Sequence, residues 1–308
     1  MRRAWAIKEA DISETSPQDL SGVAETLLIP LYIRAMESQR PDALIKDEKA
    51  VELVARLSAD DGFRRDMDRI RQIRIIEMGK VTRILQSCEM DRQVRDFLRR
   101  HPEAVVVHIG CGLDARFERV CSEQPDIGQV EWYDLDLPEV IELRRVLFGD
   151  EGERHHLLAC SVLDEAWLDI VSAHRPRPFL FLADGVFIYL QEAQVRSLVL
   201  TLCDRFPGAE LVFDVLSPLE VWEGNRRFAR NKLDARLHWG IWHGQVLERW
   251  GDPSTSLSAG SIRLLDEWGF LDRPEPRLGH LRWLRPLESL ARSLRIYHYR
   301  LGKAAEGE

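Results

Sequence analysis

The sequence has 308 residues, but it lacks long apolar runs and any excess of basic residues. The longest apolar run near the N-terminus covers residues 27–33 and is interrupted by Pro30, so no membrane span is predicted. The basic start at Arg2 and Arg3 is not followed by an apolar segment of signal-peptide length, which predicts a cytoplasmic protein. Lys and Arg number 43 against 51 Asp and Glu, and the net charge of −8 argues against nucleic acid as a partner.

Cysteine is also scarce, and none of the five cysteines lies in a C-x-x-C pair or at zinc-ligand spacing from a histidine. We therefore expect reduced thiols and no metal site. Cys111 lies between two glycines, where a nucleophile is conceivable, but packing of a small residue under a loop is the favoured interpretation because no His or Asn partner can be assigned. Repeats and low-complexity linkers are missing too, and the length favours one large α/β domain with an appended element.

The most informative segment is VVVHIGCGLDARFER, residues 105–119. Its β-branched apolar run is typical of a buried strand, Gly110-Cys111-Gly112 ends that strand in a tight turn, and a helix-compatible segment follows. Glycine suits such a turn because a ligand can approach the backbone without meeting a Cβ, and because some positions require a positive φ. In an α/β sheet this arrangement marks a nucleotide-type pocket at the carboxyl end of the first strand.

Helical patterns precede this segment, and helical and strand patterns alternate after it. Apolar spacing predicts helices within residues 24–37, 47–57 and 63–100. The later alternation predicts a doubly wound, mainly parallel α/β sheet, with helices that begin near Glu139 and Gln191 and a short one near Asp164. Strands are expected at residues 105–109, 130–134, 155–159, 179–184, 210–214, 262–270 and 294–301, with an insertion at about 215–260.

Polar residues or glycines stand at the ends of the first four expected strands. They are Gly110 and Gly112, Asp134 or Asp136, Ser161, and Asp184. Because these strand ends face the same crevice, we expect the residues to line one pocket. Asp134 follows Gly112 by 22 residues, the spacing at which an acidic residue binds the ribose hydroxyls of an adenosine. A carboxylate suits two adjacent hydroxyls because each oxygen can accept one hydrogen bond.

The turn also matches G-x-G-x-x-A, a pattern of dinucleotide oxidoreductases, through Gly110, Gly112 and Ala115. Asp114 disfavours that alternative, because it lies where a pyrophosphate would meet the helix N-terminus and would repel it. S-adenosylmethionine has no phosphate and carries an ammonium and a sulfonium, so an acidic turn is tolerable for it. The long helical part before the first strand also fits a lid better than half of a dinucleotide fold.

Five blocks along the chain are Arg40-Pro41-Asp42, VVVHIGCGLDAR, WYDLDLPEVIELRR, SVLDEAW and ADGVFIYL. In this order they resemble the leucine carboxyl methyltransferase family, and most closely its bacterial branch of polyketide-type O-methyltransferases. The likeness extends over about residues 24–301. It implies a class I, Rossmann-like methyltransferase fold that uses S-adenosylmethionine, with an N-terminal helical lid over residues 1–100 and a cofactor-binding core over residues 101–308.

The resemblance also implies a role for each matching position. Gly110 and Gly112 would line the methionine portion of the cofactor, with Asp114 beside them, and Asp184 would lie near the methionine end. The ribose would be held by Asp136 and also by Asp134 as a second candidate. The adenine would be bordered by Ser161 and Val162.

Three positions depart from the family pattern. Ala115 replaces a threonine, Asp184 replaces a glutamate, and Gln86-Ser87-Cys88 occupies the place of an Arg-Thr-Arg group that meets the cofactor carboxylate. Arg83 or Lys80 would have to substitute for that group from an adjacent turn. If each weakened contact costs about 1 kcal/mol, cofactor affinity falls about a hundredfold, so a weakly active or non-catalytic paralogue stays open as an alternative.

Methyl transfer from a sulfonium mainly requires alignment of the acceptor and exclusion of water. A carboxylate acceptor is already nucleophilic, whereas a hydroxyl acceptor can need a general base, for which the candidates are Tyr189, His238 and His243. On a helix the two histidines would lie about 140° apart, so a shared metal site is not expected. We expect a small, apolar acceptor with a hydroxyl or carboxyl group, in a pocket that the tryptophans of the insertion help to shape unless they pack in the core.

Overall fold

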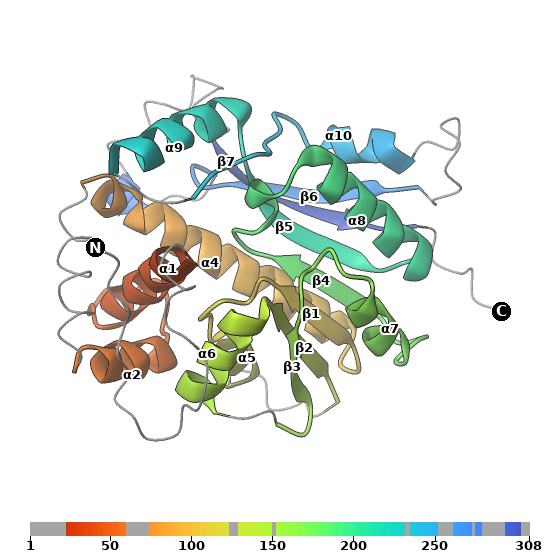
Figure 1. Ribbon diagram of the computed structural model, residues 1–308, viewed down its shortest axis with the longest axis horizontal. Coiled ribbons are helices and arrows are strands. Elements are labelled where there is room, and N and C mark those ends of the chain that lie inside the picture. Colours follow the sequence, from red (N-terminus) through yellow and green to blue (C-terminus); the bar gives the residue numbers. More distant parts are fainter. Residues whose placement is uncertain are drawn as a thin grey trace.

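The computed structural model of the protein describes residues 23–59, 74–122, 129–149, 152–231, 235–251, 261–272, 275–278 and 293–302. Its centre is a seven-stranded sheet in the order β3-β2-β1-β4-β5-β7-β6 (Figure 1). The strands are β1 (Val105–Ile109), β2 (Glu131–Asp136), β3 (His155–Ala159), β4 (Phe179–Ala183), β5 (Glu210–Leu216), β6 (Arg263–Gly269) and β7 (Leu294–Arg300). The described helices are α1 (Val23–Ser38), α2 (Glu48–Leu57), α4 (Arg74–Arg100), α5 (Arg116–Ser122), α6 (Pro138–Phe148), α7 (Ala166–Ser172), α8 (Glu192–Arg205), α9 (Pro218–Asn231) and α10 (Gln245–Glu248), with 3-10 turns η1 (Phe187–Tyr189) and η2 (Arg249–Gly251).

The predicted fold class is confirmed. Strands β1 to β5 are parallel, and each expected strand is present with ends shifted by at most two residues. The sequence pattern did not indicate that β7 lies antiparallel between β5 and β6. Because the dinucleotide fold orders its strands 3-2-1-4-5-6, this extra antiparallel strand counts against the dinucleotide alternative.

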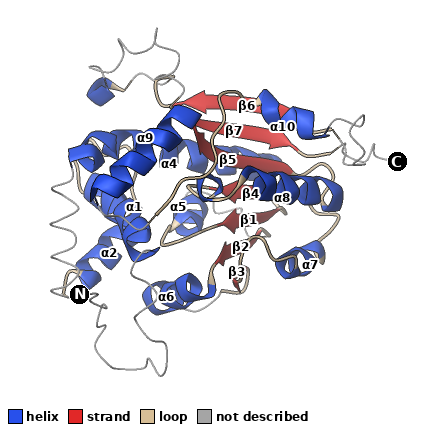
Figure 2. Ribbon diagram, turned by 45° about the horizontal axis from the view of Figure 1, so that its top comes forward, coloured by secondary structure: helices blue, strands red, loops and turns tan. Residues whose placement is uncertain are grey.

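Both faces of the central sheet are covered, as Figure 2 shows for α8 on one face. Val105, Val107 and Ile109 of β1 pack in one cluster with α7 and α8, whereas Val106 packs in a second cluster with Val94 and other residues of α4. This burial on both faces explains the continuous apolar sequence of the strand.

The helix starts follow local capping rules. Asp47 accepts a hydrogen bond from the backbone N–H of Ala50 at 2.8 Å and so caps α2. Pro138 occupies the first turn of α6, where its missing N–H has no helical partner. Gln191 and Gln194 form a reciprocal cap at the start of α8. None of the described helices is long and apolar enough to cross a membrane.

The N-terminal helices pack on the core rather than apart from it. Helix α1 packs against α2 and α4 and continues through Pro30. The C-terminal end of α4 is tied to the sheet by Arg100, whose guanidinium donates to both carboxylate oxygens of Glu210 at 2.9 and 2.8 Å. Residues 63–73 of the expected third helix, and 232–234 and 252–260 of the expected insertion, lie outside the described residues. The division of the chain at residue 100 stays a prediction.

Candidate active site

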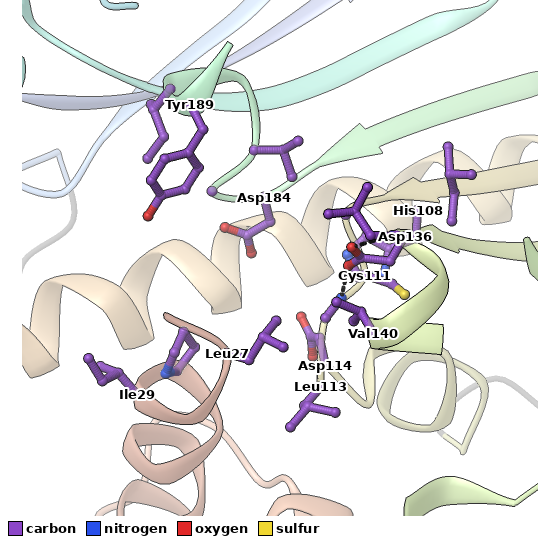
Figure 3. A pocket seen from close by; sticks show the side chains of 18 of the residues that line it. Leu27, Ile29, His108, Cys111, Leu113, Asp114, Asp136, Val140, Asp184 and Tyr189 are labelled. Atoms are coloured by element: carbon purple, nitrogen blue, oxygen red, sulfur yellow. Dashed lines mark hydrogen bonds between the residues drawn. The ribbon is translucent and has the colours of Figure 1, made fainter. Parts of the chain in front are cut away.

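A cavity of about 530 Å³ opens at the carboxyl ends of the parallel strands (Figure 3). The turn after β1, the ends of β2 and β4, and the segment after β3 form one side. Opposite them lie Leu27 and Ile29 of α1, and α4 and α9 complete the wall. Of the predicted cofactor residues, those that line it are Arg83, Gly110, Gly112, Asp114, Asp136, Ser161, Val162 and Asp184. The cavity size lies within the usual range for a small-molecule site.

The glycine turn needs glycine for two separate reasons. Gly110 and Gly112 have positive φ angles of 63° and 50°, which side chains disfavour. A Cβ on Gly110 would also clash with Cγ2 of Val186, and a Cβ on Gly112 would lie 2.9 Å from Cδ2 of Leu27. The turn is fixed to β2 because the Gly110 N–H donates to the Leu135 carbonyl at 2.7 Å.

The two candidate ribose ligands on β2 lie in different environments. Asp136 lines the cavity, and its carboxylate accepts hydrogen bonds from the Gly112 and Leu137 N–H groups, both at 2.8 Å. Burial raises the pKa of Asp136, and those two bonds partly offset the effect. Asp134 does not line the cavity; its fully buried carboxylate binds Arg144 at 2.5 Å and His155 at 2.7 Å. Of the two, Asp136 alone is placed to reach a ligand directly.

Asp114 is not a free carboxylate, as the sequence interpretation assumed, because three guanidinium groups surround it. Its carboxylate lies 2.7 Å from Arg119, 3.1 Å from Arg116 and 3.7 Å from Arg34. Burial alone would raise its pKa, but these guanidinium groups outweigh burial and hold the pKa of Asp114 well below its ordinary value. The same three arginines also bind Asp47, Asp91 and Asp184, so three cations are shared by four carboxylates. The sheet topology gives an independent distinction from the dinucleotide fold.

The methionine end of the predicted site is built around Asp184. Its Oδ2 accepts from Arg116 Nη2 at 2.7 Å, and its Oδ1 accepts from Gln86 Nε2 at 2.6 Å. Of the two cations expected to replace the missing arginine group, Arg83 lines the cavity, whereas Lys80 lies over the ring of Tyr32. Ala115 is fully buried and does not line the cavity, so its lost hydroxyl removes no direct contact with a ligand there.

The three candidate bases do not lie together. Tyr189 lines the cavity, and Figure 3 shows its hydroxyl directed into it. Burial raises the pKa of Tyr189, so the phenol stays protonated near neutral pH. His238 and His243 are exposed, do not line the cavity, and belong to an irregular segment rather than a helix. His238 instead hydrogen-bonds Gln191 at 2.9 Å.

The insertion contributes to the cavity through residues that the sequence did not single out. Phe228 of α9 and Ala235 line the wall, whereas no tryptophan of the described ranges does. Trp239 and Trp250 are buried in the core, and Trp222 is 54% exposed on α9. Among the described residues, no group of three His, Cys, Asp or Glu side chains could hold a metal ion.

Sequence reasoning also missed Asp214, whose carboxylate is buried behind the cavity. It accepts from the Gly185 N–H at 2.5 Å and fixes the turn after β4. Burial, reinforced by the charge of Asp184, raises the pKa of Asp214 to about 7. Asp214 meets Gly185 and Asp184 only because of the register of β4 against β5. In the sequence, the available signal was an acidic residue at the end of the fifth apolar run.

We expect Asp214→Asn to flatten the pH dependence of stability. The unfolded carboxyl has a pKa near 4, whereas the pKa of Asp214 in the folded protein is about 7. Between these two pH values the folded protein holds a proton that the unfolded chain releases, so stability falls as pH rises. Above this range the full free-energy cost of the buried carboxylate applies. Asparagine removes this titration and keeps an acceptor for Gly185. Between pH 5 and 8 wild type should lose roughly 1–3 kcal/mol more unfolding free energy than the variant in urea titrations. Identical pH slopes would contradict the assignment.

Comparison with known proteins gives consistent results. The family model for leucine carboxyl methyltransferase matches residues 28–203. The chain is 33% identical, over 83% of its length and 86% of the relative, to the tetracenomycin polyketide synthesis O-methyltransferase TcmP of Streptomyces glaucescens. It is 30% identical to the S-adenosyl-L-methionine-dependent methyltransferase dpfgK of Gibberella zeae, over 61% of the chain and 62% of that protein. A crystal structure of a DUF574 family protein from Streptomyces avermitilis shares the fold, with a TM-score of 0.54, 15% identity and coverage of 91% of this chain and 97% of that one.

Proposed function

Because the chain belongs to the leucine carboxyl methyltransferase family and is an S-adenosylmethionine-dependent methyltransferase, we propose that it methylates an oxygen atom of a small, largely apolar acceptor of the polyketide type. The observation that carries this proposal is a cavity in which a glycine turn faces an apolar wall. The glycine side suits the cofactor. The apolar side, with Ile29, Ile33 and Phe228, suits a hydrophobic acceptor.

We assign the cofactor residues by position. Arg83 and Asp184 would bind the amino-acid end, Gly110 and Gly112 the backbone side of the cofactor, and Asp136 the ribose. Ser161 and Val162 would border the adenine. The cofactor would supply the electrophilic methyl group, while the cavity wall aligns the acceptor and excludes water.

We expect the acceptor oxygen to be nucleophilic before it binds, without deprotonation by the protein. Among the described residues that line the cavity, Tyr189 is protonated, and burial keeps the pKa of the Cys111 thiol well above its ordinary value. His108 is 1% exposed and lies between Arg116 and Asp134. The charge of Asp184 is shared with Arg116 and Gln86. A carboxylate or an acidic phenol therefore fits this site better than an aliphatic alcohol.

Two measurements test the proposal. Calorimetric titration should show binding of S-adenosylmethionine and S-adenosylhomocysteine but not of NAD. Radiolabelled methyl transfer should then be found with phenolic or carboxylated polycyclic aromatics and not with aliphatic alcohols of similar size. Cofactor binding without transfer to any oxygen of this panel would support the non-catalytic alternative, and no binding of either adenosyl ligand would overturn the enzyme assignment.

Tyr189→Phe should reduce kcat/KM for the acceptor about tenfold and leave cofactor affinity unchanged. The reason is that a protonated phenol can donate one hydrogen bond to the acceptor but cannot remove a proton from it. His238→Ala and His243→Ala are the matched controls and should match wild type, because neither side chain reaches the cavity. A loss of more than about a hundredfold in kcat, with a changed pH profile, would instead identify Tyr189 as a general base.

A further inference from the structure

The wall of the cavity holds a hydrogen-bond acceptor that has no partner in the described protein. Gln86 of α4 lines the cavity and is 3% exposed, and its Oε1 is buried without a hydrogen bond. The other end of the amide, Nε2, donates to Asp184 Oδ1 at 2.6 Å. This orientation of the amide is fixed by chemistry, because turning it would place a carbonyl oxygen against a carboxylate oxygen.

An unpaired buried acceptor is costly, so its presence beside a ligand cavity indicates that a ligand donor completes it. The neighbouring Asp184 carboxylate uses one lone pair on each oxygen and keeps further acceptor capacity. A neutral and an anionic acceptor therefore lie side by side. A primary ammonium, which carries several N–H donors and a positive charge, matches that pair.

Helix α4 also places a cation next to these acceptors. Arg83 lines the cavity three residues before Gln86, a spacing that puts both on one helix face. No ion pair involving Arg83 is present within the described part of the chain. One face of α4 thus offers a guanidinium and an amide acceptor, a combination that suits the carboxylate and ammonium of an α-amino acid.

We propose that Gln86 Oε1, together with Asp184, accepts hydrogen bonds from the α-ammonium of the cofactor. This inference rests on the proposed function and adds a residue to it. It also gives a physical reason why the shorter Asp184 is tolerated: the Gln86 amide, which donates to Asp184, adds an acceptor beside it without adding a second buried charge.

The test compares two ligands in the full-length protein. S-adenosylhomocysteine carries the α-amino acid, whereas 5′-methylthioadenosine keeps the adenosine and sulfur and lacks it. Gln86→Met should weaken binding of S-adenosylhomocysteine about tenfold in calorimetry and leave 5′-methylthioadenosine unchanged. The matched control is Gln93→Met on the same helix, since Gln93 binds Glu89 and Asp266 and does not line the cavity. It should bind both ligands as wild type does.

A second measurement varies the ligand as well as the protein. S-adenosylhomocysteine without its amino group should bind wild type more weakly than the parent ligand, and Gln86→Met should shrink that difference. Equal losses for both adenosyl ligands, or no loss for either, would overturn the assignment of Gln86 while leaving the proposed function intact. Failure of wild type to bind either ligand would instead overturn the proposed function, and this inference with it.

Discussion

Gly110→Ala is expected to destabilise the protein and to abolish measurable cofactor binding. The added Cβ would clash with Cγ2 of Val186, and the φ of 63° would be strained for any side chain. The backbone strain costs about 1–2 kcal/mol, and forced overpacking adds about 1–3 kcal/mol. Both Gly110 and Val186 line the cavity, so relief of the clash must move one of its walls. Urea unfolding and titration with S-adenosylmethionine would measure the two effects.

Two companion variants separate the backbone strain from the steric clash. Gly149 has a φ of 97°, and a Cβ added there would meet no atom of the described residues within 4 Å. Gly149→Ala should therefore show a backbone cost without a clash, in a conformation that is almost restricted to glycine, and leave cofactor affinity unchanged. Adding Val186→Ala to Gly110→Ala removes Cγ2 and should recover part of the stability. If Gly110→Ala alone binds the cofactor as wild type does, the turn does not hold the ligand.

The sequence predicted those elements correctly whose structure depends on local pattern. Val105 to Ile109 is a strand buried on both faces, and such strands carry a continuous apolar run that needs no tertiary information to identify. The same holds for the glycine turn and for Pro138 at the start of α6. These local features, combined with the rule that ligands bind at the carboxyl ends of parallel strands, placed most of the cavity correctly.

What failed depended on groups that meet only in three dimensions. Asp134 and Asp136 lie two residues apart on β2, and which one reaches the cavity depends on where the strand ends beside the glycine turn. Spacing alone pointed to Asp134, which instead binds Arg144 and His155 inside the protein. His238 and His243 were candidate bases by residue type alone, and the structure places both side chains on the exposed side of an irregular segment, outside the cavity.

Asp114 belongs to a buried ion network that the sequence pattern did not indicate, and this network holds the site together. Arg116 is fully buried and lies 2.8 Å from Asp91 of α4, 3.1 Å from Asp114 in the turn and 2.7 Å from Asp184 after β4. Burial lowers the stability of its charged form, but these carboxylates outweigh burial and raise the pKa of Arg116. One guanidinium therefore joins three separate elements of the cavity wall, and its planar fork suits that task better than an ammonium.

Arg116→Met should accordingly lower the free energy of unfolding by about 3–5 kcal/mol, because removal of one partner leaves buried carboxylates uncompensated. Cofactor affinity should fall as well, since Asp184 loses the group that positions it. The unfolding free energy of Arg116→Lys should lie between those of wild type and Arg116→Met, because a single ammonium cannot bind all three carboxylates. Arg40→Met is the control: it removes an exposed ion pair with Asp42 and should leave the urea midpoint unchanged. If Arg116→Met unfolds with the free energy of wild type, the packing of methionine stabilises the fold as much as the ion network does. The network would then serve to position the ligand rather than to stabilise the fold.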